Sequence, residues 1–304
     1  MEFALSTSWN AFRHKSGKEM LFEIIKLGFD RVELSFNLEK PMISQIELLV
    51  KDGTIRVSSV HNYCPVPETL PREEALPDSY SLSSLNEEER KIALKYTKRS
   101  IDTAASLGAK AVVLHCGRVE AKDRTRELIG LFDRANPGSK EFLALRDQAL
   151  KERSLSSASF FQKTLFSLDE LNSYASKKSV LLGVETRFYL REIPSFEEVG
   201  LILDKFEGSN IYYWHDTGHA QVMENLQICA QLDFLKQYAR SMIGVHLHDV
   251  SLCRDHLAPG SAELDFSIFK PYLKPDTVKV IEAHYPAKPE ELQKARKILD
   301  EALK

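Results

Sequence analysis

Six side chains that can bind a metal ion follow one another along the chain, each at or near the end of a short apolar segment. They are His61, His115, Glu185, Asp216, His246 and Glu282. An ionised carboxylate is costly to bury without a partner, so several carboxylates in such positions predict that a cation meets them. Imidazole nitrogen and carboxylate oxygen both bind divalent metals, and this mixture suits zinc or manganese, with cobalt or magnesium as alternatives. We therefore expect a divalent metal centre.

Each residue taken singly has a simpler explanation. A histidine in an apolar segment is often a satisfied core residue, and an acid at such a position is often paired with an arginine or lysine. Six such residues at matching positions are explained together by one bound ion or a pair of ions, so we favour the metal interpretation for the set.

The segments that must position these residues alternate between strand-like and helix-like patterns. Apolar or β-branched segments predict strands at 3–8, 31–36, 54–61, 110–115, 180–186, 210–216, 242–248 and 277–283. Helical periodicity occurs between them at 18–27, 41–51, 88–107, 160–177, 195–206, 223–239 and 289–303. This alternation is typical of a parallel sheet buried on both faces.

Eight such units predict a (β/α)8 barrel, a TIM barrel, with residues 1–304 forming a single α/β domain. A doubly wound open sheet is the alternative, although no G-x-G-x-x-G follows the first predicted strand. Residues 62–87 and 116–159 are expected to be long loops after strands three and four. Both lie on the side where strand C-termini converge, so all six candidate ligands would face one cleft.

Composition excludes several partners and places. The net charge is −3, which provides no basic field for nucleic acid and no reason to expect a membrane surface. No apolar stretch approaches the roughly 18 residues of a spanning helix, and the N-terminus lacks a signal peptide pattern. The four cysteines are scattered without CxxC spacing. We expect reduced thiols and a cytoplasmic protein, with homo-oligomerisation left open.

The motifs around these residues resemble those of the xylose-isomerase-like barrel superfamily, which groups sugar isomerases and epimerases with AP endonucleases of the endonuclease IV type. The motifs that carry the resemblance are VHNY, VVLHCG, GVETR, HDTGHA, VHLHD, DHLAPG and VIEAH. The resemblance implies that Glu185, Asp216, His246 and Glu282 bind one divalent metal. It also implies that the two glutamates form an acid–base pair and that His61 and His115 complete a second metal site.

The sequence departs from the endonuclease pattern at two places. The endonucleases hold a third metal with the second histidine of D-x-x-H, here His219, and with a D-x-H pair after strand seven. Aligning DHLAPG on that pair puts His256 on the histidine and Arg254 where the aspartate belongs, and a cation there disfavours a third ion. The pattern D-T-C-H also becomes D-T-G-H, with Gly218 in place of cysteine.

Further residues are candidates for binding substrate. We expect His219 and His256 to orient it. Arg187 lies on the same strand face as Glu185 and is predicted either to bind a phosphate or carboxylate or to pair with Glu185. Glu33 ends the second strand and is predicted to hydrogen-bond substrate or to form a structural ion pair. Trp9 follows the first strand and is predicted to stack on a sugar face or to fill the rim of the cleft.

Two other histidines adjoin the predicted ligands. His248 is interpreted as a polar loop residue in preference to a second ligand, because His246 matches the family position. His215 should point away from Asp216, into the layer between barrel and helices.

The chemistry that fits this site is proton transfer at a carbon next to a carbonyl. A metal chelated by the carbonyl and its adjacent hydroxyl stabilises an enediolate, while Glu185 and Glu282 remove and return the proton. The sequence, with this resemblance, therefore predicts an enzyme whose partner is a small carbohydrate substrate. It is expected to be a metal-dependent isomerase or epimerase of a sugar or sugar phosphate. The alternatives are an endonuclease IV-like phosphodiester hydrolase, a keto-inositol or keto-sugar dehydratase, and a non-catalytic sugar or metal sensor on the same fold.

Overall fold

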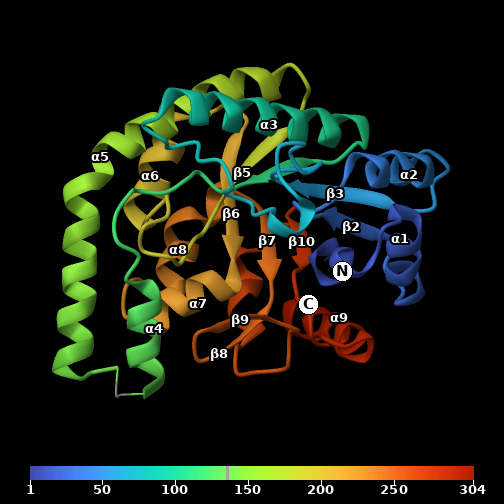
Figure 1. Ribbon diagram of the computed structural model, residues 1–304. Helices are drawn as coiled ribbons and strands as arrows, with labels where there is room; N and C mark the ends of the chain where they lie inside the picture. The colour runs from blue at the N-terminus through green and yellow to red at the C-terminus, as the bar shows by residue number, and fades with distance from the viewer. Residues whose placement is uncertain (135–136) are drawn as a thin grey trace.

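Eight strands close into a parallel barrel in the computed structural model, which describes residues 1–134 and 137–304. In spatial order they are β1 (Ala4–Ser6), β10 (Val278–Ile281), β7 (Met242–Leu247), β6 (Ile211–Asp216), β5 (Leu181–Glu185), β4 (Ala111–Leu114), β3 (Arg56–His61) and β2 (Arg31–Leu34). The pairing of β10 with β1 closes the sheet. The predicted (β/α)8 barrel is confirmed, with each strand shorter than its predicted segment (Figure 1).

Helices surround the barrel (Figure 1). They are α1 (Gly17–Lys26), α2 (Lys40–Lys51), α3 (Glu87–Ser106), α4 (Thr125–Arg134), α5 (Lys140–Ser176), α6 (Phe196–Lys205), α7 (Thr217–Asn225), α8 (Gln231–Tyr238) and α9 (Pro289–Leu303). Local sequence explains several of their starts. The Ser16 hydroxyl accepts a hydrogen bond from the N–H of Glu19 at the start of α1, and Ser195 forms a capping box with Glu198 at α6.

Two predicted elements differ from the structure. The expected loop at 116–159 contains α4 and the first half of α5, which is 37 residues long, because apolar residues such as Leu128 and Phe142 pack into the buried layer around Tyr213. The single helix expected at 223–239 is interrupted between α7 and α8. Gln227 has a left-handed backbone (φ 55°), and the N–H of Ile228 bonds to the carbonyl of Met223, which is a helix-terminating arrangement.

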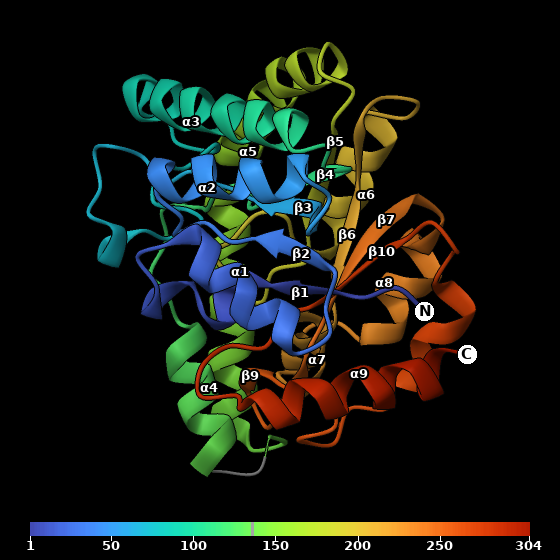
Figure 2. The ribbon, with the colours of Figure 1, turned by 90° about the vertical axis from the view of Figure 1, so that its right-hand side faces the viewer.

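The connection after β3 remains irregular, as expected, apart from one short 3-10 turn at Arg72–Glu74. A small antiparallel hairpin formed by β8 (Asp249–Ser251) and β9 (Arg254–Leu257) follows β7. The chain ends lie close together (Figure 2), and the N-terminal ammonium pairs with Asp300 of α9. In the described residues, no helix is both long and apolar enough to span a membrane.

The interior of the barrel is filled below the strand C-termini by the indole of Trp214 on β6. It packs with a small buried cluster that includes Ala4, Ala111, Val113, Ile243 and Val280. The neighbouring strands carry glycine where they face this ring, and a Cβ atom at Gly244 would lie 2.1 Å from Trp214 Cζ3. At Gly183 the corresponding distance to Cε3 is 2.8 Å. The indole also contacts the ring of His246, with 5.2 Å between centroids.

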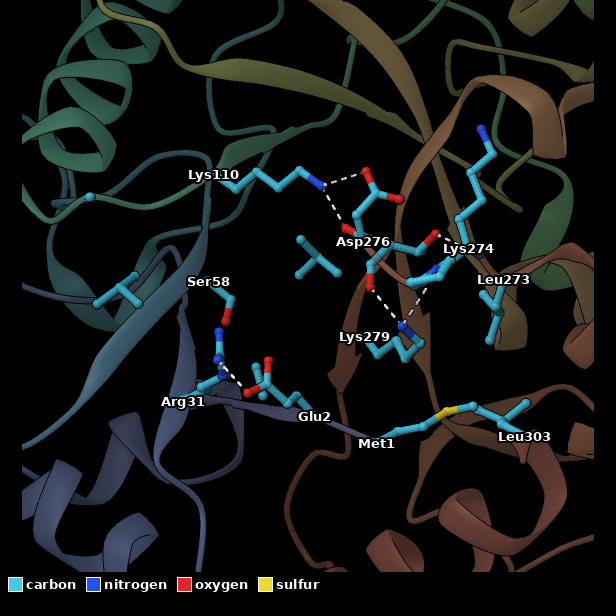
Figure 3. Close-up of a pocket in the computed structure, with 16 residues that line it drawn as sticks. Met1, Glu2, Arg31, Ser58, Lys110, Leu273, Lys274, Asp276, Lys279 and Leu303 are labelled. Atoms are coloured by element: carbon cyan, nitrogen blue, oxygen red, sulfur yellow. Dashed lines mark hydrogen bonds and ion pairs between the residues drawn. The ribbon is translucent and has the colours of Figure 1, made fainter.

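A hollow lies at the N-terminal end of the barrel strands (Figure 3). It has a volume of about 570 Å³ and is lined by residues such as Ala4, Val57 and Val278. Its lysines are already engaged, since Lys110 pairs with Asp276 and Lys279 donates to the carbonyl of Thr277. None of the predicted site residues lines this hollow, so we place the chemistry at the other end.

Because Trp214 leaves no room beside it, Gly244→Ala is expected to destabilise the protein by about 1–3 kcal/mol through overpacking. Gly130→Ala is a matched control, since a Cβ there meets only an arginine nitrogen of Arg134 at 3.6 Å. In the middle of α4 that change should stabilise the protein by up to about 1 kcal/mol. Urea unfolding of the three proteins measures both effects. Equal stability of Gly244→Ala and wild type would contradict this description of the barrel interior.

Candidate active site

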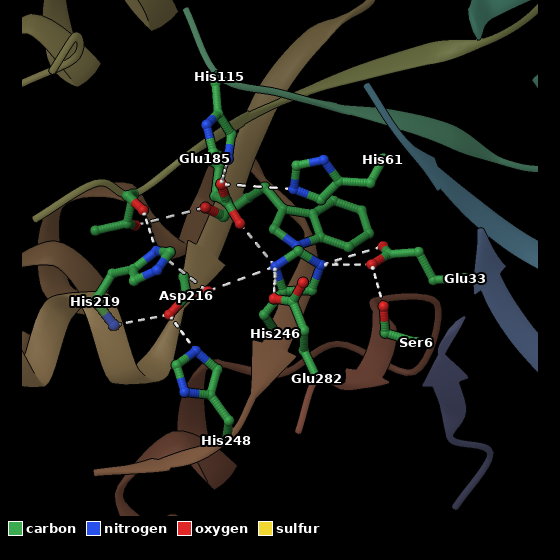
Figure 4. A network of polar contacts seen from close by, with 12 residues as sticks. Ser6, Glu33, His61, His115, Glu185, Asp216, His219, His246, His248 and Glu282 are labelled. Atoms are coloured by element: carbon green, nitrogen blue, oxygen red, sulfur yellow. Dashed lines mark hydrogen bonds and ion pairs between the residues drawn. The ribbon is translucent and has the colours of Figure 1, made fainter. Parts of the chain in front are cut away.

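The six predicted ligands gather at the C-terminal end of the barrel (Figure 4). Four of them, Glu185, Asp216, His246 and Glu282, are buried and offer ligand atoms that all lie within 4.8 Å of one another. Their common point is Nδ1 of His246. It lies 2.7 Å from Oε1 of Glu185, 2.9 Å from Oε2 of Glu282 and 3.5 Å from Oδ2 of Asp216.

Glu33 holds the other side of the His246 ring. Both of its carboxylate oxygens lie 3.1 Å from Nε2 of His246, and Ser59 and Ser6 donate hydroxyl hydrogen bonds to the same carboxylate. Glu33 is fully buried and does not line the pocket, so the predicted contact with substrate is wrong. An acceptor at Nε2 requires a proton there, which leaves Nδ1 to face the three carboxylates.

The charges in this group are strongly coupled. Burial alone lowers the pKa of His246, but the carboxylates of Glu282 and Glu33 outweigh it and hold this pKa well above its ordinary value. Burial raises the pKa of Asp216 and of Glu185, but nearby positive groups outweigh it. His219 is the main opposing group for Asp216 and Arg187 for Glu185, and both pKa values lie well below normal. Without another cation, the protonated His246 is the positive charge that the carboxylates surround.

His61 and His115 form a second group with Glu185, all three buried. Nε2 of His115 lies 2.8 Å from Oε2 of Glu185, and Nε2 of His61 lies 3.9 Å from the same oxygen. Burial is the main cause that lowers the pKa of His61, which favours its neutral, metal-binding form. The two predicted histidines therefore lie beside the first group and share one carboxylate with it.

Arg187 adopts the second of its two predicted roles. Its Nη1 donates to Oε2 of Glu185 at 2.8 Å, and its Nη2 donates to Oε1 of Glu192 at 3.0 Å. The same guanidinium lines the pocket, and its Nε is buried without a hydrogen-bond partner. Glu192 was missed from the sequence, since it lies in the loop after β5 with no strand pattern to mark it.

His219 and His256 face each other across the carboxylate of Asp255. Nε2 of His219 lies 3.6 Å from Oδ2 of Asp255, and Nδ1 of His256 lies 3.0 Å from the same oxygen. Arg254, which the alignment put in place of an acid here, is exposed. The predicted repulsion of a cation at this position is therefore wrong, because the next residue in the hairpin supplies a carboxylate.

A pocket of about 300 Å³ opens above these groups. Its polar lining includes His61, His115, Glu185, Arg187, Glu192, His219, His256, Glu282 and His284, and its mouth carries charged residues of both signs, Asp78, Asp123, Arg126 and Arg191. Phe36 and Tyr189 provide aromatic surface. Leu76 and Pro77 come from the irregular connection after β3, so that connection forms part of the wall.

The predicted stacking of Trp9 on a sugar is wrong. Its side chain is buried in the core, its indole N–H donates to the carbonyl of Ala287 at 2.8 Å, and it does not line the pocket. His215, as expected, points out of the barrel. Its ring packs against Phe269 and its Nδ1 lies 2.7 Å from the hydroxyl of Tyr213.

Comparisons with known proteins agree with the fold. A family model described as xylose isomerase-like TIM barrel matches residues 22–302. An uncharacterized protein, y4fM, from Sinorhizobium fredii is 23% identical over 239 residues, covering 76% of this chain and 67% of the relative. Two solved structures, both under 25% identical, share the fold. A D-tagatose 3-epimerase-like protein has a TM-score of 0.70 at 19% identity, and the match covers 100% of this chain and 97% of that protein's chain. The 3-keto-D-glucoside 4-epimerase YcjR from E. coli has a TM-score of 0.69 at 16% identity, over 99% of both chains.

The contact between Glu33 and His246 predicts a measurable charge effect. In protein treated with a chelator, Glu33→Gln should lower the pKa of His246, because one of the carboxylates that raise it becomes neutral. Histidine NMR titration measures the value. Glu192→Gln is the matched control, since Glu192 is buried but pairs with Arg187 and not with His246. An unchanged pKa in Glu33→Gln would show that the carboxylate does not act on this ring.

Proposed function

This chain belongs to the xylose isomerase-like TIM barrel family, and we propose that it is a divalent-metal-dependent sugar isomerase or epimerase. The observation that carries the proposal is the convergence of Glu185, Asp216, His246 and Glu282 at the base of a polar pocket. The two similar structures are named as an epimerase-like protein and an epimerase, which supports a sugar isomerase or epimerase as the general class.

The residues fit a divalent ion. Oδ2 of Asp216 is buried and is directed towards His246. It has no hydrogen-bond partner. Three carboxylate oxygens and one imidazole nitrogen form a mixed donor set that suits zinc, manganese or cobalt better than calcium. A divalent ion bound there supplies a Lewis acid for the carbonyl and adjacent hydroxyl of the sugar and stabilises an enediolate.

Glu185 and Glu282 are the proposed acid–base pair. Both line the pocket and approach Nδ1 of His246 from different strands, as two bases on either side of a substrate carbon would. Their surroundings differ. Oε2 of Glu185 already accepts hydrogen bonds from Arg187, and lies 2.8 Å from His115, so this oxygen is committed to other partners. We therefore assign the abstraction of the carbon-bound proton to Glu282, which keeps it, and the delivery of a proton to the carbon to Glu185, which must first take that proton from solvent.

The remaining polar lining suits a small polyhydroxylated substrate. Arg187, His219 and His256 are assigned to its hydroxyl groups or to a phosphate, and Phe36 takes the aromatic role that had been predicted for Trp9. Burial is the main cause that lowers the pKa of His219 to about 4, so at neutral pH its ring is uncharged and can accept as well as donate a hydrogen bond.

The proposed reaction predicts exchange of a carbon-bound proton with solvent. Metal-loaded protein should introduce deuterium next to the carbonyl of at least one member of a panel of ketoses, keto-polyols and their phosphates in heavy water. Glu282→Gln and Glu185→Gln should each reduce the rate by about 10²–10⁴-fold. NMR follows the deuterium, and Glu170→Gln, an exposed carboxylate of α5, is the control.

Metal content per chain must be measured for every variant, because both glutamates are also proposed ligands. A variant that keeps its metal and loses exchange supports the acid–base role. Loss in only one of the two variants would support a one-base isomerisation, and loss of water from the substrate would support the dehydratase alternative. A wild-type protein that holds no divalent ion contradicts the proposal.

A phosphodiester hydrolase is the second candidate, which the group formed by His61, His115 and Glu185 favours. The pocket mouth carries Asp78 and Asp123 beside Arg126 and Arg191, so it offers no uniformly basic surface to a nucleic acid backbone. We expect no cleavage of duplex DNA containing an abasic site, even with zinc added, in a gel assay with the zinc-loaded protein. Cleavage that disappears in Asp216→Ala would overturn this expectation.

A further inference from the structure

The ring of His248 lies against the carboxylate of Asp216 (Figure 4), and it does not line the pocket. His248 lies in the connection between β7 and β8, as a loop residue would, but its side chain is fully buried. Its backbone is fixed to the start of α7. The Thr217 hydroxyl donates to the carbonyl of His248 at 2.9 Å, and the N–H of His248 lies 3.1 Å from the same hydroxyl oxygen.

Both ring nitrogens of His248 have defined partners. The backbone N–H of His256 donates to Nδ1 at 2.9 Å, and Nε2 lies 2.8 Å from Oδ1 of Asp216. A backbone N–H can only donate, so Nδ1 carries the lone pair and the proton is on Nε2. Nε2–H therefore donates to Asp216. One nitrogen of His248 also lies within 4.8 Å of ligand atoms of Asp216, His219 and His256, but both nitrogens are occupied by protein partners in this arrangement.

These bonds decide which oxygen of Asp216 faces His246 and the other proposed ligands. Oδ1 accepts from the His248 ring and also from the N–H of His219, at 2.7 Å, as the N-cap of α7. Oδ2 has no hydrogen-bond partner and lies 3.5 Å from Nδ1 of His246. The carboxylate is thus held in one rotation, with Oδ2 turned towards the other proposed ligands.

The ring of His248 occupies the space that a side chain at residue 218 would need. A Cβ atom at Gly218 would lie 2.0 Å from Cε1 and 2.3 Å from Nδ1 of His248. Any residue larger than glycine would displace the imidazole from Asp216. The glycine of D-T-G-H and the second histidine of V-H-L-H-D therefore depend on each other, although 30 positions separate them.

We propose that His248 is a positioning residue that orients Asp216 for the ion, and that Gly218 serves to admit its ring. The role rests on the proposed function only in requiring that a divalent ion binds at Asp216. Hydrogen bonds to a ligating carboxylate or histidine typically change metal affinity by about 10–100-fold. His248 contributes in this way without touching ion or substrate.

The test measures metal affinity directly. Dissociation constants for zinc and cobalt are determined by competition with a chromophoric chelator for wild type, His248→Phe, His248→Gln, His248→Ala, Gly218→Ala and Gly218→Ala/His248→Ala. His248→Phe should bind about 10–100-fold more weakly. His248→Gln should recover most of the loss, because its amide N–H can reach the position of Nε2–H. The visible spectrum of bound cobalt should change in His248→Phe and return towards wild type in His248→Gln.

The two positions should also be coupled. Gly218→Ala should weaken binding in the wild-type background and add little in the His248→Ala background, since the ring it displaces is already gone. His215→Phe is the matched control. It removes an equally buried imidazole beside Asp216 that points out of the barrel, and it should leave the affinity within about twofold of wild type.

The outcomes separate the two proposals. If wild type binds the ion and His248→Phe binds it equally well with an unchanged cobalt spectrum, the positioning role is wrong while the proposed function stands. Additive losses in the double variant would also refute the dependence of His248 on Gly218. If wild type binds no divalent ion, both proposals fail. Chelator-treated variants are compared by thermal unfolding, and the glutamine and double variants keep the test decisive if His248→Phe does not fold.

Discussion

The central constraint on this molecule is the burial of four carboxylates around one imidazole ring. Glu33, Glu185, Asp216 and Glu282 are each at most 5% exposed, and all of them contact or closely approach His246. So much negative charge cannot be buried without compensation. The guanidinium of Arg187 supplies one compensating positive charge, to Glu185. The protonated ring of His246 supplies another at the centre of the group. The geometry of the strand ends is therefore tied to the charge state of this ring.

Strand periodicity was sufficient to predict where the main site residues lie. Each candidate ligand ends an apolar segment, and in a parallel barrel such ends meet on one face, which is why His61 on β3 and Glu282 after β10 lie in one pocket. The outward direction of His215 followed from the same alternation. Periodicity also identified every barrel strand, because each is largely buried and contains a short run of apolar or β-branched residues.

Other features depend on contacts that no local pattern reveals. Glu33 contacts His246, which lies 213 positions away in the chain. This contact could not be inferred from the strand that carries Glu33. Asp255 replaces Arg254 at the site because a one-residue change of register in a hairpin exchanges the faces, and the left-handed backbone of His256 (φ 56°) adds a local twist. Trp9 resembled a rim aromatic in sequence, and only the packing around Ala287 shows that it is buried.

The indole of Trp214 limits how deep a ligand can travel. It fills the barrel directly beneath His246 and is held between two strands that carry glycine towards it, so it cannot swing aside without a clash. A substrate of the proposed kind that enters from the mouth would stop at the ligand group, with its reacting carbons at that depth. The far end of the molecule then projects towards the wall formed by Leu76 and Pro77. Such a cavity is selective for the end of the substrate that enters first and tolerates different lengths at the other end.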